Sequence, residues 1–321
     1  MKRLYLMKNP ELFQGEEKLK NNKIYFEGWY FKNTIKDTGI SFIPGISITK
    51  EGKKAFIQVI TNDKSYYIDY NIEDFKFSHS PFYIKIGKNM FSKDKIKIDI
   101  KDKNLNLKIK GNINYYDIKT IDTSKYPNIM GPFSYIPFME CNHAVLCMRG
   151  KTKGKLIIND KKIDFNNGTT YIEKDFGSSF PKSYIWCQGN NFKDNSNTAF
   201  MLSIADIPFK VFSFRGLICS VIIDNKEYRF ASYNNSKIKK YEINEDTLDI
   251  TLEKGIYILN IKSNFSKGLK LIAPIKGKMD KEILENINEE ITITLKKDNK
   301  IIFSDTSINC GLEIVMRNYN I

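Results

Sequence analysis

The chain has 321 residues, of which 41% are hydrophobic and 13% aromatic, so it is long and apolar enough to bury a core. Its formal net charge of +14 would suit a nucleic acid or an anionic membrane as partner. The lysines are spread along the whole chain, however. We therefore expect a solvated lysine surface and no nucleic-acid partner, and we leave open a weak contact with an anionic membrane surface.

Sequence features also bear on the compartment. No stretch approaches the roughly 18 apolar residues of a membrane span, and the basic N-terminus lacks the apolar run of a signal peptide. The five cysteines form an odd count without a CxxC pair, which fits reduced thiols better than a disulfide scaffold. We expect a cytoplasmic protein that is at most peripheral at a membrane.

In chain order, nearly every periodic segment predicts a short strand rich in isoleucine, tyrosine or phenylalanine and bounded by turn residues. Hairpins at this density predict an all-β protein, built as an antiparallel sandwich or barrel. The clearest strand segments are residues 46–49, 55–61, 65–72, 95–101, 105–109, 155–158, 199–205, 257–262, 291–296 and 300–304.

One segment near the C-terminus, residues 279–288, predicts a short helix instead. Ile283, Leu284 and Ile287 stand at positions i, i+1 and i+4, behind Asp280 as a cap. A single helix late in a β-chain is typical of a lid or plug against a barrel.

The two halves of the chain resemble each other. Trp29 and Trp186 each lie in an aromatic strand, YFEGWYFKN and KSYIWCQGNNF, and two further apolar strands follow each of them. This pattern predicts a duplication, with a boundary within residues 119–137, where proline, glycine and serine cluster. We expect an N-terminal barrel over residues 1–135 and a C-terminal barrel over residues 136–321.

Three blocks, YFEGWYFK (25–32), ECNHAVLCM (140–148) and YIEKDFGSSFPKSYIWCQGNNF (171–192), resemble in order and spacing those of the tocopherol cyclase-like family. That family is similar to carotenoid hydratases and other lipocalin-like proteins with two barrels. The resemblance implies a double calycin fold, an apolar ligand held within a barrel, and cofactor-independent, acid-catalysed cyclisation of a prenylated quinol or related isoprenoid. The alternatives are a non-catalytic carrier of an isoprenoid, quinone or lipid, and an isoprenoid alkene hydratase.

Such a cyclisation begins with protonation of an alkene. It needs an acid kept protonated by burial, aromatic walls that stabilise a cation, and exclusion of water. In a strand, Glu173 and Asp175 share a face with Tyr171, and two neighbouring carboxylates can share a proton. We interpret Asp175 as the acid and either Glu173 or Glu27 as the partner that accepts the phenolic proton. Alternatively, Glu173 is a strand-edge charge and Asp175 caps a turn.

Glu27 has a structural alternative as well. Tyr25, Glu27, Trp29 and Phe31 share one strand face, so Glu27 lies at a barrel rim or base beside its tryptophan, either as a structural partner or as part of a polar site. The predicted substrate-binding residues are Trp29, Tyr30, Phe176, Tyr184, Trp186, Gln188, Asn190 and His143.

His143 admits two further interpretations. It shares a face with Cys141 and Cys147, but residues at i, i+2 and i+6 of one strand cannot converge on one zinc ion without other ligands. We therefore predict no metal site and favour a hydrogen-bonded, half-buried histidine.

Overall fold

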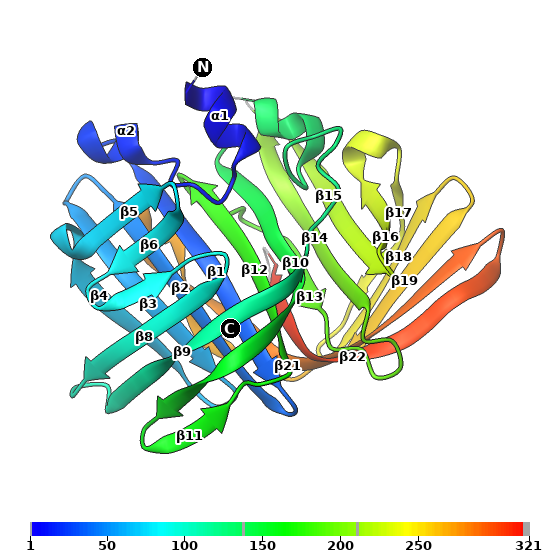
Figure 1. Cartoon of the computed structure of the whole chain (residues 1–321). Coiled ribbons are helices and arrows are strands. Elements are labelled where there is room, and N and C mark those ends of the chain that lie inside the picture. The colour runs from blue at the N-terminus through cyan, green and yellow to red at the C-terminus, as the bar shows by residue number, and fades with distance from the viewer. Residues whose placement is uncertain (1, 137–138, 210–211, 317–321) are drawn as a thin grey trace. The chain divides into compact units, whose positions relative to one another are not determined.

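The computed structural model describes residues 2–136, 139–209 and 212–316, and its strands confirm the predicted all-β class (Figure 1). The chain divides into two compact units. The first consists of residues 1–180 and 271–282, and the second of residues 181–270 and 283–321. Each unit is built around one antiparallel sheet with a hydrophobic core of its own.

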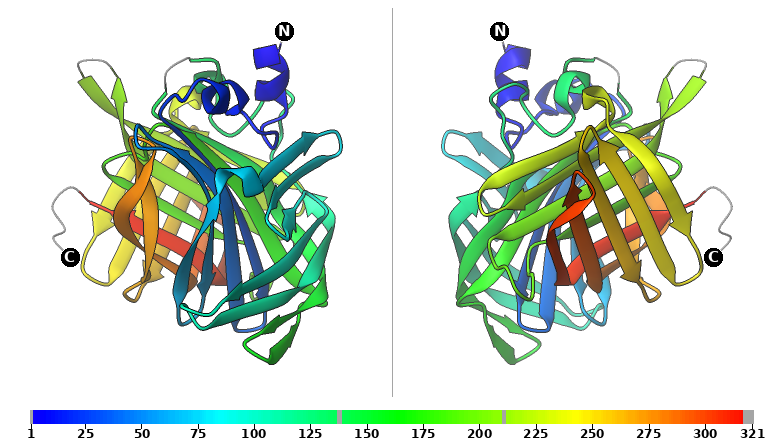
Figure 2. Two further views of the ribbon diagram at one scale, coloured as in Figure 1. Left: turned by 90° about the vertical axis from the view of Figure 1, so that its left-hand side faces the viewer. Right: turned by 90° about the vertical axis from the view of Figure 1, so that its right-hand side faces the viewer.

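The sheet of the first unit has the strand order β4-β3-β2-β1-β12-β10-β9-β8-β7-β6-β5, with β11 paired to β10. It curls into a nearly closed, barrel-like sheet around the first core (Figure 2, left view). Its strands are β1 (Tyr25–Ile35), β2 (Thr38–Ile48), β3 (Lys53–Thr61), β4 (Ser65–Asn71), β5 (Phe75–His79), β6 (Phe82–Ile86), β7 (Asn89–Phe91), β8 (Lys95–Asp102), β9 (Leu107–Lys119), β10 (Cys141–Ile158), β11 (Lys161–Asp164) and β12 (Gly168–Gly177).

The sequence alternation fixes which face of these strands is inside. In β8, KIKIDIKD, the three isoleucines are buried in the core while the lysines point outward. In β1, Tyr25, Trp29 and Phe31 belong to the core. The intervening positions of β1 therefore form its outer face.

The second sheet, which belongs to the second unit except for residues 271–282 of β20 and β21, has the order β16-β15-β14-β13-β22-β21-β19-β18-β17, with β20 paired to β21 (Figure 2, right view). Its strands are β13 (Tyr184–Gly189), β14 (Thr198–Phe209), β15 (Phe212–Ile223), β16 (Lys226–Ala231), β17 (Lys237–Ile243), β18 (Thr247–Lys254), β19 (Tyr257–Asn264), β20 (Leu269–Ile275), β21 (Lys278–Lys297) and β22 (Lys300–Val315).

Helices are few in the described ranges. They are two α-helices, α1 (Lys2–Lys8) and α2 (Glu16–Lys20), and three 3₁₀ turns, η1 (Ile72–Asp74), η2 (Gly131–Tyr135) and η3 (Ser232–Asn234). Among the described residues, none of these helices has the length and apolar character needed to cross a membrane.

The two sheets repeat one topology, in line with the duplication inferred from the sequence. In each, four successive strands form a meander (β1 to β4, and β13 to β16), and the first strand of the meander also pairs with the last long strand of its unit (β12 or β22). The two tryptophans occupy the first strand of each meander but differ in direction. Trp29 lies in the first core, whereas Trp186 lies on the face of β13 opposite the core residues Ile185 and Cys187.

The predicted helix over residues 279–288 is wrong, because this segment lies within the long strand β21. Ile283, Glu285, Ile287 and Glu289 are all buried, which is the two-residue period of a strand. Pairing with β22 outweighs the local i, i+1, i+4 pattern that suggested a helix.

The observed division also differs from the predicted domains 1–135 and 136–321. β10 and β12 lie beyond residue 135, yet they are paired between β9 and β1 in the first sheet. The first unit therefore extends to Phe180, and the segment 119–137 lies within it.

Candidate active site on the first sheet

The three sequence blocks that carry the chemistry become neighbouring strands. β12 pairs with β1 on one side and with β10 on the other (Figure 1). One rung of this ladder joins Gly28, Asp175 and His143, the next joins Trp29, Lys174 and Ala144, and the third joins Tyr30, Glu173 and Val145. Because side chains alternate along each strand, these rungs present one set of residues to the core and another to the outer face.

On the core face, Glu27 forms an ion pair with Lys174. The Lys174 Nζ atom lies 2.5 Å from Glu27 Oε1, and both side chains are fully buried. Glu27 also accepts hydrogen bonds from the backbone N–H groups of Gln14 and Gly15 and, at 2.7 Å, from the hydroxyl of Tyr25. A buried carboxylate with this many donors is fully satisfied.

Lys174 and Trp29 complete this core-face group. Lys174 Nζ donates to the carbonyl oxygens of Pro10 and Leu12, and it lies 4.8 Å from the ring centroid of Trp29. Trp29 Nε1 donates to the carbonyl oxygen of Glu11 at 2.9 Å. The group thus fastens the N-terminal segment 10–15 to the barrel-like sheet. Burial lowers the pKa of Lys174, and the attraction of Glu27 opposes that shift.

On the outer face, His143 stands between two carboxylates. Its Nδ1 atom is 2.9 Å from Asp175 Oδ1, and its Nε2 atom is 3.5 Å from Glu173 Oε2. The hydroxyl of Tyr171 donates to Glu173 Oε2 at 2.6 Å. We call these four residues, His143, Asp175, Glu173 and Tyr171, the outer-face cluster. Glu173 and Tyr171 are buried, and the Asp175 side chain is 21% exposed.

The two carboxylates determine the charge of His143. Burial would lower the pKa of this imidazole, but the negative charges of Asp175 and Glu173 outweigh it and raise the pKa to about 9. His143 is therefore a protonated imidazolium at neutral pH. Burial, together with the charge of Asp175, raises the pKa of the nearby Cys141 thiol, whose Sγ atom is 3.8 Å from Asp175 Oδ1, so this thiol stays protonated.

The two ring nitrogens of His143 differ in their hydrogen bonding. The Nδ1–H group is committed to Asp175, whereas Nε2 is buried with no hydrogen-bond partner among the described residues. The 3.5 Å separation from Glu173 is too long for a good hydrogen bond. A cation with one anchored N–H and one unengaged N–H has the arrangement of a positioned general acid.

The same cluster contains three possible metal ligands. One nitrogen of His143 and one oxygen each of Glu173 and Asp175 lie within 4.8 Å of one another. The Nδ1 to Asp175 separation of 2.9 Å is that of a direct hydrogen bond.

Several predicted site residues join the cluster and others do not. Tyr30 packs edge-on against Tyr171 and accepts a hydrogen bond from Ser41 on the outer face. Phe176 lies on the core face, and its ring centroid is 5.0 Å from Lys174 Nζ. Glu27 and Trp29 are also on the core face, so the structure does not bring Glu27 together with Glu173 and Asp175.

The remaining predicted contacts belong to the second unit. Tyr184, Trp186 and Gln188 share the face of β13 that points away from the second core, and Asn190 follows the strand. The Tyr184 hydroxyl donates to Glu313 at 2.7 Å. Gln188 is 1% exposed, and its Nε2 atom has no hydrogen-bond partner in the described part of the chain.

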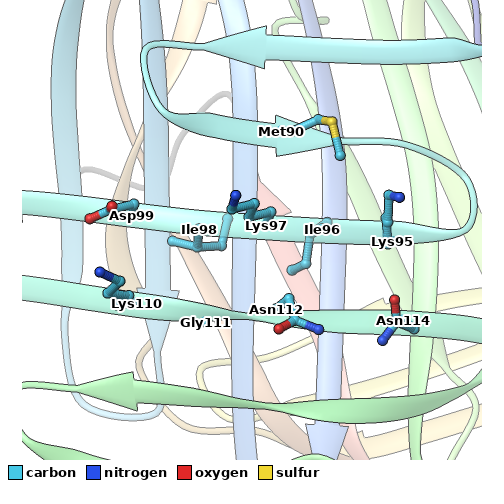
Figure 3. Close-up of a pocket in the computed structure, with 10 residues that line it drawn as sticks. All are labelled: Met90, Lys95, Ile96, Lys97, Ile98, Asp99, Lys110, Gly111, Asn112 and Asn114. Atoms are coloured by element: carbon cyan, nitrogen blue, oxygen red, sulfur yellow. The ribbon is translucent and has the colours of Figure 1, made fainter.

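A surface pocket elsewhere on the first sheet contains none of these residues (Figure 3). It lies over β7, β8 and β9 and is lined by Met90, Lys95, Ile96, Lys97, Ile98, Asp99, Lys110, Gly111, Asn112 and Asn114. Three lysines at an open surface do not suit an apolar ligand, so we do not place the site there.

Comparison with known proteins gives one family. The model of the family described as tocopherol cyclase-like matches residues 116–315. A rice protein (Oryza sativa subsp. japonica) described as a probable tocopherol cyclase, chloroplastic, is 30% identical over 74 residues. This matched segment spans 23% of the present chain and 16% of the rice protein.

Two solved structures share the fold. The first is a candidate AttH from Nitrosomonas europaea, with 11% sequence identity and a TM-score of 0.56 over 92% of this chain and 94% of the other. The second is kievitone hydratase from Nectria haematococca, with 13% identity and a TM-score of 0.51 over 96% and 94%. At these identities the likeness bears on the fold alone.

Proposed function

Because the chain belongs to the tocopherol cyclase-like family, we propose that it is an enzyme that protonates an alkene of an isoprenoid-like small molecule and closes a ring on the resulting cation. The outer-face cluster is the proposed site. The observation that carries this proposal is the imidazole of His143, which is anchored by Asp175 through Nδ1 and whose Nε2 has no hydrogen-bond partner among the described residues. We propose no cofactor, because proton transfer and ring closure need only acid, base and positioning.

The proposed acid differs in detail from the one expected from the sequence. His143 donates the proton, and Asp175 holds the His143 ring in place. A pKa of about 9 keeps the imidazolium protonated at neutral pH, whereas a carboxylic acid would need strong desolvation to stay protonated there. Asp175 thus acts through His143 as a positioning residue.

Residues of the outer-face cluster both supply and take up the proton of the reaction. The Nε2–H bond of His143 breaks and a C–H bond forms at the alkene, which leaves a tertiary carbocation. The oxygen of the substrate's phenol then forms a C–O bond to this cation, and the phenolic proton passes to Glu173. Glu173 lies 3.5 Å from Nε2, so it can return the proton to His143 after a small movement.

Aromatic side chains on the same face suit a cationic intermediate. Tyr30 and Tyr171 lie next to the carboxylates, and Phe26 packs against Phe180 with ring centroids 5.4 Å apart. The negative faces of such rings stabilise cations by roughly 0.5–2 kcal/mol each. In the second unit, Tyr184, Trp186, Gln188 and Asn190 remain proposed contacts to an apolar ligand, and a weak contact with an anionic membrane surface remains a prediction.

The test is to incubate the purified protein with a geranyl-substituted 1,4-benzoquinol and to follow the mass and retention of the compound. A cyclised product has the mass of the quinol and a new retention time. A hydrated product gains the mass of one water, which would identify an alkene hydratase. A compound that is retained unchanged would identify a carrier and contradict the proposal.

The variant Asp175→Asn separates the site from the fold. We expect turnover to fall by about 100-fold or more, because general acid catalysis contributes factors of this size, while binding changes only a few-fold. Asp160→Asn is the matched control, since the side chain of Asp160 is 86% exposed. Equal turnover in wild type and Asp175→Asn would contradict the proposed catalytic role of the outer-face cluster.

A further inference from the structure

Gly28 lies directly beside the proposed acid. It is on the outer face of β1, paired with Asp175 of β12, and Asp175 is paired in turn with His143 of β10. A glycine in the interior of a strand is destabilising relative to alanine. Such a glycine therefore needs a reason, which is conformation, packing or a close approach by a ligand.

Conformation and packing do not supply that reason. The backbone of Gly28 is outside the positive-φ region that favours glycine. A Cβ atom at Gly28 would meet nothing nearer than Ile43 Cγ2 at 3.6 Å, which is an ordinary van der Waals contact. The fold would accept alanine at this position without strain.

Gly45, the partner of Gly28 on the neighbouring strand β2, differs from Gly28 in its packing. A Cβ atom at Gly45 would lie 2.5 Å from the ring of Phe56 and 2.7 Å from the carbonyl oxygen of Glu27. Packing therefore requires glycine at position 45. Of these two paired glycines, only Gly28 has room for a methyl group in its place.

The surroundings of Gly28 indicate what fills that space. Phe26 and Tyr30 flank it along the same face of β1, and both are buried. Asp175 and His143 lie across the next two strands. A bare backbone floor between aromatic side chains and beside an acid accommodates a flat group better than a tetrahedral one.

We infer that Gly28 is a specificity-determining position, over which a flat, unsaturated group of the substrate lies next to His143 and Asp175. This inference rests on the proposed function. A methyl group at position 28 would lift the flat group away from the acid, and a larger side chain would exclude it. Gly28 thus sets the thickness of the substrate that reaches the acid.

The test uses the two histidines of the chain as reporters. In protein labelled with isotopes at its histidines, nuclear magnetic resonance follows the chemical shifts of His143 while geranyl-substituted 1,4-benzoquinol is added. His79 is the internal control, because its ring packs against Phe77 beside the first core and not on the outer face of β12. We expect saturable shifts of the His143 signals in wild type, affinity weaker by about tenfold in Gly28→Ala and loss of the response in Gly28→Val.

Thermal unfolding distinguishes an effect of these substitutions on binding from an effect on folding. Gly28→Ala should unfold at the wild-type temperature or above it, whereas Gly45→Ala should unfold at a lower temperature because of its clash with Phe56. If folded Gly28→Ala and Gly28→Val bind the quinol as tightly as wild type, the inference is wrong and the proposed function stands. If His143 of wild type does not respond to the quinol, the proposed function fails, and the inference fails with it.

Discussion

The two faces of β12 use the same kinds of residue for opposite purposes. On the core face, Glu27 and Lys174 are fully buried, and their hydrogen-bonding groups are occupied by the segment 10–15. On the outer face, His143, Glu173 and Asp175 also form charge pairs, but His143 Nε2 has no hydrogen-bond partner among the described residues, and Asp175 is partly exposed. A buried charge is thus no sign of function by itself. Unused hydrogen-bonding capacity is the better indication.

The largest expected effect lies on the core face. Lys174→Met should lower the free energy of unfolding by about 3–5 kcal/mol, because it leaves Glu27 charged and unpaired in the core. Urea denaturation measures this loss. The double variant Lys174→Met, Glu27→Gln should recover part of it, whereas an unchanged midpoint in Lys174→Met would show that the ion pair does not hold the N-terminal segment.

The next effect is a pH dependence on the outer face. The pKa of His143 is raised to about 9 in the folded protein and is about 6.5 in an unfolded chain. Its contribution to stability, up to about 3 kcal/mol, is therefore fully present below pH 6.5 and is lost as the pH rises through 9. Unfolding measured from pH 6 to 10 should show this decline in wild type and a flatter profile in His143→Gln. Parallel profiles for the two proteins would argue against the charged imidazole.

The smallest effect concerns the hydroxyl of Tyr171. Tyr171→Phe removes its hydrogen bond to Glu173 and should lower the free energy of unfolding by about 1–2 kcal/mol. The loss of this donor also leaves the negative charge of Glu173 less compensated beside His143, so the pKa of His143 should rise further. Tyr116→Phe, at an exposed tyrosine of β9, is the control that should change neither quantity.

Alternation within strands made much of this comparison predictable. It correctly placed Glu27 with Trp29, and Glu173 and Asp175 with Tyr171, because the two-residue period depends only on local sequence. The family resemblance and the all-β class are confirmed by the family match and by the fold. The sequence also contained the three blocks that become adjacent strands, although their order in the sheet depends on pairing between distant segments.

Other features could not be predicted because they depend on such distant pairing. Lys174 was not identified as the partner of Glu27, since it lies on β12, which neighbours β1 in the sheet but is distant from it in the sequence. The role of His143 depends on two carboxylates of a neighbouring strand, which a single-strand pattern does not reveal. The helix expected over 279–288 failed because β22 provides a long pairing partner for β21. In each case a tertiary contact decided the outcome.

The most direct test of the central claim is to run the reaction of geranyl-substituted 1,4-benzoquinol in deuterated water with wild type and His143→Gln. The account predicts that wild type forms a cyclised product with deuterium on the carbon that receives the proton, and that folded His143→Gln forms it about 100-fold more slowly or less. Deuterated product formed at the wild-type rate by His143→Gln would contradict the assignment of His143 as the acid.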